Sequence, residues 1–495
     1  MASAYDELCS RQTRLYRLNH LNAICDWDRA VNMPPGGNEA RASATAEIAK
    51  ILHEMLTEPT LDNLINRAQH EVLGSCQEAN LREMKRLQRR EKALPEHLIS
   101  KKKVFSARCE YEWRNQRKAN DLNGFMQNFK GVVEVVREEA DRLSQALSLS
   151  PYEALVDAFE PGLKEEDIDA IFTPIGEWLP GLIESVIKKQ RNEPVIQPQG
   201  PFQLEAQKRL CEEIMSGLGF DFSRGRLDTS THPFCGGVPE DVRLTTRFHV
   251  DDFLGSLFAT IHETGHGLYQ QNLPARWLGQ PIGQARSMAF HESQSLFFEM
   301  QLGAHPKFME QLSRYLVRTF GDQEAFTPEN LERLVTRVER SFIRVNADEV
   351  TYPAHILVRT KLERALFAKD IEPVDLPGAW DHELYGLLGL RCNGDHEKGL
   401  LQDIHWAAGH FGYFPSYTLG AMYAAQWFAT IADLEKDLED DISAGNFTPI
   451  TEWLKCNIWD QGSRWTAEEL VSRATGEPLN PNYFRRHLET RYLGQ

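Results

Sequence analysis

The stretch from Asp251 to Asn272 constrains the fold of this chain more than any other. Its sequence, DDFLGSLFATIHETGHGLYQQN, places apolar residues at the spacing of an amphipathic α-helix. Asp251 and Asp252 precede the first apolar residue, where short acidic side chains cap helix N-termini. We therefore predict one helix here, with a buried face. The residues of that face are Leu254, Leu257, Phe258, Ile261 and Leu268.

The same helix carries His262-Glu263-Thr264-Gly265-His266, an H-E-x-x-H motif. Histidines four residues apart lie on the same helix face, so their imidazoles can share one metal ion. Glu263 lies beside that metal position and can accept a proton from a water molecule. A chance match on a surface helix is the alternative, but the apolar surroundings place both histidines near the interior.

A third metal ligand is expected from His291-Glu292-Ser293-Gln294, which follows the helix. A zinc site that keeps one position for water needs about three protein ligands, and two histidines with one glutamate form such a set. Glu292 is our candidate. The alternative for His291 and Glu292 is a solvated helix turn.

Composition narrows the class of protein. A length of 495 residues suggests two or more domains, but helix signals run along almost all of the chain, so one large two-lobed all-α body fits equally well. A net charge of −17 argues against nucleic-acid and anionic-membrane partners, and the 41% hydrophobic content supports a large core. No apolar run is long enough to span a membrane.

The eight cysteines are scattered without a C-x-x-C pair, as expected for reduced thiols in the cytoplasm. The polar N-terminal sequence MASAYDELCS predicts no signal peptide. We therefore expect a cytoplasmic protein.

The order of helix signals along the chain predicts which segments flank the H-E-x-x-H motif. A first helix over residues 3–25 is expected to break at Cys25–Asp28 and at the prolines near residue 34, before a second helix over 39–58. Charge-rich helices follow up to residue 148, so residues 1–150 are predicted to form an outer lobe or lid. Residues 200–430 are expected to carry the metal site. Pro353 is expected to kink or break a helix over residues 343–367.

One stretch departs from the helical pattern. Residues 229–250 contain β-branched and aromatic side chains near period two, which predicts a small antiparallel ribbon leading into the H-E-x-x-H helix. A strand in that position could hold an extended peptide by adding it to the sheet.

Six motifs in this order resemble the carboxypeptidase Taq family of metallocarboxypeptidases. They are HPF (232–234), D-x-R-x-T (241–245), H-E-x-x-H (262–266), H-E-S-Q (291–294), N-A-D (346–348) and G-x-x-Q-D-x-H-W (399–406). The resemblance covers nearly the whole chain, from D-W-D near residue 27 to F-G-Y-F-P-S-Y at 411–417.

The resemblance implies a mainly helical, two-lobed fold with a deep groove, similar to angiotensin-converting enzyme and neurolysin. It also implies a homodimer with one divalent metal per subunit, and removal of single residues from peptide C-termini. Zn²⁺ is expected, with Co²⁺ or Mn²⁺ as substitutes.

Site roles follow from the same resemblance. Glu263 is expected to act as the base, and His405 and Tyr417, twelve residues apart, as donors to the oxyanion, with Tyr413 as the competing tyrosine. Arg344, which precedes the N-A-D motif, is the first candidate to bind the substrate carboxylate, because a guanidinium pairs with both carboxylate oxygens. Arg243 is the second candidate, although Asp241 could hold it structurally. Further substrate-binding candidates are His232, Tyr413 and Gln402.

One position departs from related zinc peptidases, which place an aspartate four residues after the ligand glutamate to hold a histidine. Here that position is Leu296. Another carboxylate must then orient the imidazole, and Asp348 is the predicted one. A helix cap or a surface ion pair is the alternative role for Asp348.

Two other functions remain open from sequence. An endo-acting oligopeptidase on the same scaffold would cut peptides internally. A binding protein that keeps the metal without turnover would not need Glu263, and the presence of Glu263 counts against it.

Overall fold

Helices make up most of the fold, as the periodicity along the chain predicts. The structure is a computed structural model that describes residues 3–495. Its chain forms two compact units, each built from three segments. Unit 1 comprises Met1–Glu91, Val195–Val335 and Gly420–Tyr483, and unit 2 comprises Lys92–Pro194, Thr336–Leu419 and Phe484–Gln495.

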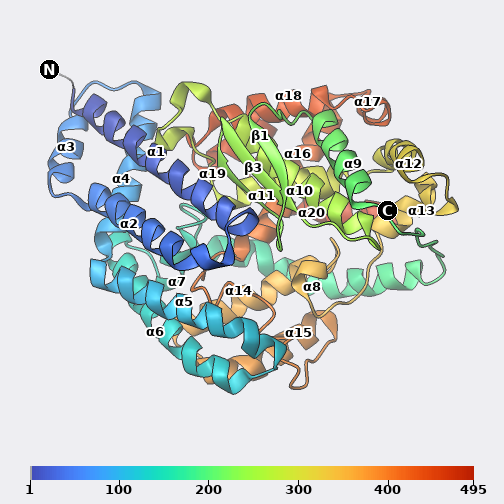
Figure 1. Ribbon diagram of the computed structural model, residues 1–495, viewed down its shortest axis with the longest axis horizontal. Coiled ribbons are helices and arrows are strands. Elements are labelled where there is room, and N and C mark those ends of the chain that lie inside the picture. The colour runs from blue at the N-terminus through green and yellow to red at the C-terminus, as the bar shows by residue number, and fades with distance from the viewer. Residues whose placement is uncertain (1–2) are drawn as a thin grey trace. The chain divides into compact units, whose positions relative to one another are not determined.

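Unit 1 contains the predicted metal-binding helix and a small sheet (Figure 1). Its elements are α1 (Ala4–Val31), α2 (Asn38–Thr57), α3 (Thr60–Ala68), α4 (Ser75–Ala93), α9 (Leu204–Gly217), β1 (Gly225–Thr229), β2 (Phe234–Val238), β3 (Asp241–Thr246), α10 (Phe253–Gln271), α11 (Met288–Leu296), the π-helix η4 (Phe297–Leu302), α12 (Pro306–Phe320), α13 (Pro328–Val335), α16 (Pro415–Leu434), α17 (Leu438–Ala444), α18 (Thr448–Asn457) and α19 (Ala467–Thr475). The first residues of α16 belong to unit 2.

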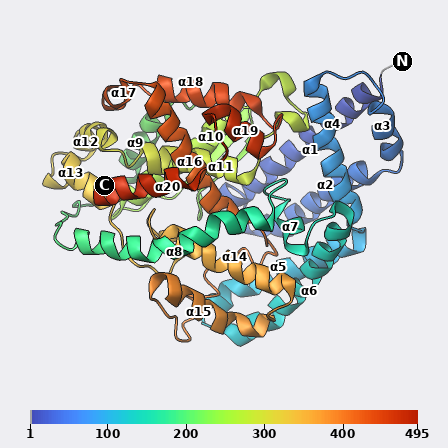
Figure 2. The same ribbon diagram turned by 180° about the vertical axis from the view of Figure 1, so that it is seen from behind.

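Unit 2 is helical throughout, with α14 and α15 packed against α8 and α5 against α6 (Figure 2). Its elements are α5 (Glu96–Lys118), α6 (Leu122–Leu147), α7 (Pro151–Val156), α8 (Glu165–Gln190), the short 3-10 helix η6 (Arg344–Asn346), α14 (Tyr352–Ala368), α15 (Leu376–Leu388), α20 (Pro481–Leu488) and the π-helix η9 (Glu489–Leu493). A loop over residues 389–414 joins α15 to α16.

The sheet has three strands in the order β1-β3-β2. β2 and β3 form the predicted antiparallel ribbon, with Val238 opposite Asp241. Gly237 is required at this hairpin, because its φ is +115° and a Cβ there would lie 2.0 Å from the carbonyl oxygen of Asp241. The parallel pairing of β1 with β3 was not predicted, since β1 begins before the stretch with alternating residues. Both β2 and β3 pack against α10.

The N-terminal helix is longer than the sequence predicts. α1 continues through Cys25–Asp28 to Val31, so the predicted break there is wrong, and Trp27 is buried. No proline or glycine lies between residues 25 and 31, so nothing prevents the helix from continuing. The chain turns only at Pro34 and Pro35, and α2 then follows as predicted.

Pro353 begins α14 rather than kinking it. The N–H groups in the first turn of a helix have no acceptor within the helix, so proline, which lacks an N–H, is well tolerated there. Among residues 3–495, no helix combines the length and the apolar content that a membrane span requires.

Glu349 joins the C-terminal residues to the rest of unit 2. Its buried carboxylate accepts hydrogen bonds from His487 Nε2 (2.7 Å), Arg491 Nη1 (3.1 Å) and the Tyr492 hydroxyl (3.0 Å). Burial alone would raise the pKa of Glu349, but these three partners outweigh burial and lower that pKa to about 2.

Candidate metal centre

The helix that carries the H-E-x-x-H motif forms as predicted. Asp252 is its N-cap and accepts a hydrogen bond from Gly255 N at 3.0 Å. Leu257, Ile261 and Leu268 are each 1% exposed, and the other two predicted core residues are half-buried. This burial fixes which helix face carries the histidines.

Two glycines allow the neighbouring helices to approach the motif closely. A Cβ at Gly265 of α10 would lie 2.4 Å from the carbonyl oxygen of Gln294 in α11. A Cβ at Gly420 of α16 would lie 2.8 Å from Cβ of Glu292. Only glycine at these positions permits this spacing, and the spacing determines where the Glu292 carboxylate lies.

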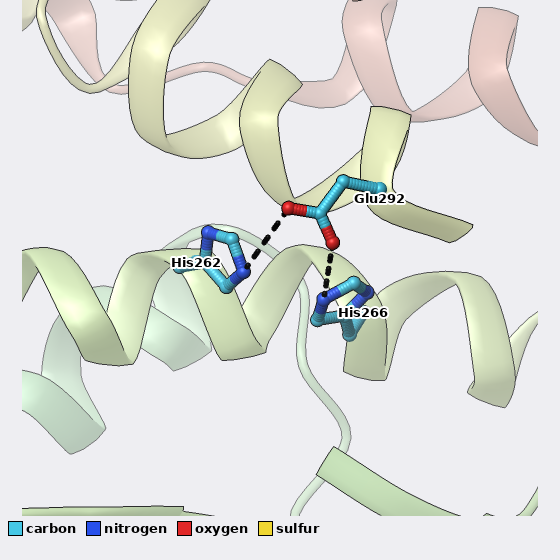
Figure 3. A group of neighbouring side chains, drawn as sticks. All are labelled: His262, His266 and Glu292. Carbon is cyan, nitrogen blue, oxygen red and sulfur yellow. Dashed lines mark ion pairs between the residues drawn. The ribbon is translucent and has the colours of Figure 1, made fainter. Parts of the chain in front are cut away.

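His262, His266 and Glu292 come together as the sequence predicts (Figure 3). One possible ligand atom from each residue lies within 4.8 Å of the others. His262 Nε2 is 4.0 Å from Oε1 of Glu292, and His266 Nε2 is 3.7 Å from Oε2. Two ligands bound tetrahedrally at 2.0–2.1 Å are about 3.4 Å apart, so modest side-chain movements would place all three around one ion.

The charges of this cluster also suit a divalent cation. Glu292 and Glu263 are each 7% exposed, and Glu299 is a third carboxylate, beside His262. Burial, together with Glu292 and Glu299, raises the pKa of Glu263 to about 7, although His262 opposes this shift. A divalent cation placed among these carboxylates would offset their mutual repulsion. The donor set and its charge therefore fit a divalent metal ion.

Glu299, not Asp348, is the carboxylate that contacts a ligand histidine. Its Oε2 lies 2.7 Å from Nδ1 of His262, which orients Nε2 of that ring towards Glu292. Although burial opposes the shift, Glu299, Glu292 and Glu263 raise the pKa of His262 to about 10. Glu299 lies seven residues, or two turns, after Glu292, and that spacing is the signal by which sequence reasoning could have found it.

Asp348 caps a turn within unit 2. Its two oxygens accept hydrogen bonds from the backbone nitrogens of Glu339 (3.0 Å), Val350 (3.0 Å) and Thr351 (2.9 Å), and from the Thr351 hydroxyl (2.9 Å). This is the capping alternative that the sequence left open.

His291 lies behind the second ligand. Its Nδ1 is 2.6 Å from Nδ1 of His266, and burial lowers the pKa of His291 to about 4. The residue is half-buried in α11, so it does not lie on a solvated turn.

The predicted oxyanion and carboxylate residues gather in unit 2. His405 Nε2 is 3.3 Å from the Tyr417 hydroxyl, and the Tyr413 ring lies 5.6 Å from the His405 ring and 5.2 Å from the Tyr417 ring. The guanidinium of Arg344 lies 5.0 Å from the centre of the Tyr417 ring. Burial, and the charge of Arg344, lower the pKa of His405 to about 3 despite the opposing charge of Asp403.

Arg344 is held in place by Asp403. Its Nε and Nη2 donate to Oδ1 of Asp403 at 3.0 and 2.9 Å, and its Nη1 donates to the Tyr352 hydroxyl at 2.6 Å. Gln402 accepts from the Arg344 backbone nitrogen at 2.8 Å and donates to the carbonyl oxygens of residues 342 and 398. Gln402 therefore fixes the backbone that carries Arg344.

A second arginine, which sequence reasoning missed, shares the same carboxylate. Arg359 is completely buried and donates from Nε to Oδ2 of Asp403 at 2.7 Å. The two guanidinium groups hold the pKa of Asp403 far below its usual range, even though burial opposes this. Arg344, Arg359 and Asp403 together carry one net positive charge.

The two remaining candidates lie in unit 1. Arg243 forms a bidentate ion pair with Asp241, at 2.9 Å for each contact, and lies 4.3 Å from the Trp27 ring. The sequence had left this structural role open for Arg243. His232 is exposed, and its backbone oxygen accepts a hydrogen bond from the Ser230 hydroxyl at 2.6 Å.

Known proteins are similar to this chain over almost its whole length. The sequence profile of the Carboxypeptidase Taq (M32) metallopeptidase family matches residues 7–492. Thermostable carboxypeptidase 1 of Thermus thermophilus is 36% identical over 99% of this chain and 98% of its own. Among solved structures, Trypanosoma cruzi metallocarboxypeptidase 1 is 42% identical with a TM-score of 0.97, over 99% of both chains. Pyrococcus furiosus carboxypeptidase, solved as Apo-Mg, is 32% identical with a TM-score of 0.94, over 99% of both chains.

Proposed function

The chain belongs to the carboxypeptidase Taq family and is a metallocarboxypeptidase, and from this premise we propose which residues carry its reaction. His262, His266 and Glu292 hold one divalent metal per subunit. The observation that carries this proposal is the approach of their donor atoms to within 4.8 Å of one another. Two imidazoles and one carboxylate, with a position left for water, favour Zn²⁺, and Co²⁺ and Mn²⁺ are expected to substitute.

A divalent metal held there would supply a Lewis acid that polarises a peptide carbonyl and makes a water molecule more acidic. Glu263 would accept a proton from the attacking water and pass it to the leaving amine. Its burial, and its place in α10 next to the proposed ligand His262, support this role.

His405 and Tyr417 are proposed as the donors to the oxyanion of the tetrahedral intermediate. Their hydrogen bond and the burial of His405 support a pair with fixed geometry. Tyr413 packs on both rings and remains the competing donor.

Arg344 is proposed to bind the substrate's terminal carboxylate. Its ion pair with Asp403 does not cancel the charge of the group, because Arg359 also contributes a positive charge. Such a buried, rigid guanidinium suits a carboxylate that must be recognised one residue beyond the scissile bond. Arg243, His232, Gln402 and Tyr413 are further proposed contacts for the peptide.

The remaining proposals concern the enzyme as a whole. We expect broad specificity for the C-terminal residue, a homodimer and a cytoplasmic location. Four expectations about the fold also stay predictions. They are the deep groove, the similarity to angiotensin-converting enzyme and neurolysin, an outer lobe formed by residues 1–150, and a metal-bearing part formed by residues 200–430.

Metal content tests the ligand assignment directly. The wild-type protein, stripped with a chelator and dialysed against Zn²⁺, should retain one ion per chain. His262→Ala, His266→Ala and Glu292→Ala should each lose the ion, while His70→Ala, which changes an exposed histidine in unit 1, should retain it. Full occupancy in all three ligand variants would overturn the assignment.

A further inference from the structure

The contact between His266 and His291 is not explained by metal ligation alone. Nδ1 of His291 lies 2.6 Å from Nδ1 of His266, on the side of the His266 ring opposite to the nitrogen that faces Glu292. His291 is therefore placed behind a proposed ligand, in the position that Glu299 occupies behind His262.

The helices hold His291 rigidly in this position. His291 and Glu292 are neighbours in α11, so their side chains point about 100° apart around that helix. The His291 ring packs between two residues of α10, with ring centres 4.7 Å from His266 and 5.3 Å from Tyr269. Tyr269 is fixed in turn, because its hydroxyl accepts a hydrogen bond from Arg286 N at 3.3 Å.

If His266 binds a metal, only one assignment of donor and acceptor is possible in this contact. Two Nδ1 atoms at 2.6 Å share a single proton, so one imidazole donates and the other accepts. Ligation through Nε2 of His266 requires a lone pair there, so its proton must lie on Nδ1 and point to His291. If His291 were the donor instead, the proton of neutral His266 would lie on its Nε2 and would block metal binding there.

We propose that His291 is a positioning residue for the metal centre, which accepts the Nδ1 proton of His266 and thereby fixes the ring and the tautomer that ligation needs. The inference rests on the proposed metal site and deepens it. The H-E-S-Q motif then supplies two functions from adjacent residues, since Glu292 ligates and His291 orients.

The two ligand histidines are thus oriented by different acceptors. Glu299 presents a carboxylate to His262, whereas His291 presents a neutral imidazole to His266. A neutral acceptor fixes the ring without adding another negative charge beside Glu263, Glu292 and Glu299.

Two variants separate an acceptor role from a packing role. In His291→Asn, the side-chain oxygen takes roughly the place of Nδ1 and can still accept the proton. In His291→Leu, a side chain of similar size has no acceptor. The dissociation constants for Zn²⁺ are measured by competition with a chromophoric chelator. The visible spectrum of the Co²⁺-loaded protein reports the ligand geometry, and circular dichroism of the metal-free variants reports folding.

His291→Leu should weaken Zn²⁺ binding by about 10-fold to 100-fold and alter the Co²⁺ spectrum, the size expected for a lost orienting partner. His291→Asn should stay within a few-fold of wild type and keep the wild-type spectrum. Equal losses in both variants, or no loss in either, would overturn the proposal. If wild type itself bound no metal, or His266→Ala bound it normally, the proposed metal site would fail instead.

Discussion

Gly420→Ala should displace a metal ligand without touching any group that reacts. A Cβ at this position of α16 would lie 2.8 Å from Cβ and 2.9 Å from Cγ of Glu292, and 3.2 Å from the carbonyl oxygen of Ala289. Carbon atoms in favourable contact are about 3.5–4.0 Å apart. Either Glu292 or α16 must therefore move by roughly 0.7–1.2 Å.

This displacement should weaken metal binding and also lower the stability of the fold. Overpacking a core costs about 1–3 kcal/mol, and alanine in place of glycine inside a helix returns up to about 1 kcal/mol. The net loss in unfolding free energy should be about 0–3 kcal/mol. Metal–ligand distances, in contrast, tolerate only about 0.2 Å, so Zn²⁺ affinity should fall at least about 10-fold, or about 1.4 kcal/mol.

Chelator competition measures the affinity, and chemical denaturation of the metal-free protein measures the stability. Gly181→Ala is the matched control, because Gly181 lies inside α8 with nothing within 4 Å of an added Cβ. That variant should keep wild-type affinity and gain up to about 1 kcal/mol of stability. Wild-type affinity in Gly420→Ala would refute the reasoning that this glycine places Glu292.

Three further substitutions test separate parts of the account. Glu263→Gln should retain the metal yet lower kcat by roughly 100-fold to 10,000-fold, and near-normal turnover with bound metal would point to another base. Tyr417→Phe should lower kcat by about 100-fold or more with little change in KM, and the same loss in Tyr413→Phe alone would reverse the choice of donor. Folding lowers the pKa of Glu349 to about 2, so its ionised carboxylate stabilises the native state. The stabilisation is roughly 3 kcal/mol above about pH 4.5 and decreases progressively as the pH falls towards 2. Glu349→Gln should therefore be less stable than wild type at pH 7, with a gap that narrows by pH 3 in denaturation curves; a constant gap would contradict the assigned pKa.

The metal-binding helix was predictable because its signals are local. The cap at Asp252 and the apolar spacing define the helix, and the spacing of His262 and His266 places both on one face. Glu292 followed from the number of ligands that the chemistry requires.

Glu299 escaped prediction because the pattern of related zinc peptidases points to the position four residues after Glu292. Glu299 lies further on, in the π-helix η4 that follows Leu296. Counting four residues from Glu292 at α-helical spacing leads to Leu296, whereas the structure uses the residue seven positions on. Non-local contacts explain the other omissions, since neither the pairing of β1 with β3 nor the approach of Arg359 to Asp403 leaves a local pattern.

Product analysis on paired peptides tests the central claim, that this chain removes C-terminal residues through a bound metal. Wild-type protein loaded with Zn²⁺ is incubated with a peptide ending in a free acid and with its C-terminal amide, and mass spectra are recorded over time. We expect loss of single residues from the C-terminus, no reaction after chelation, and at least about a tenfold preference for the acid, since one charge-assisted contact contributes roughly 1.5–3 kcal/mol. Internal cleavage at equal rates on acid and amide would contradict it.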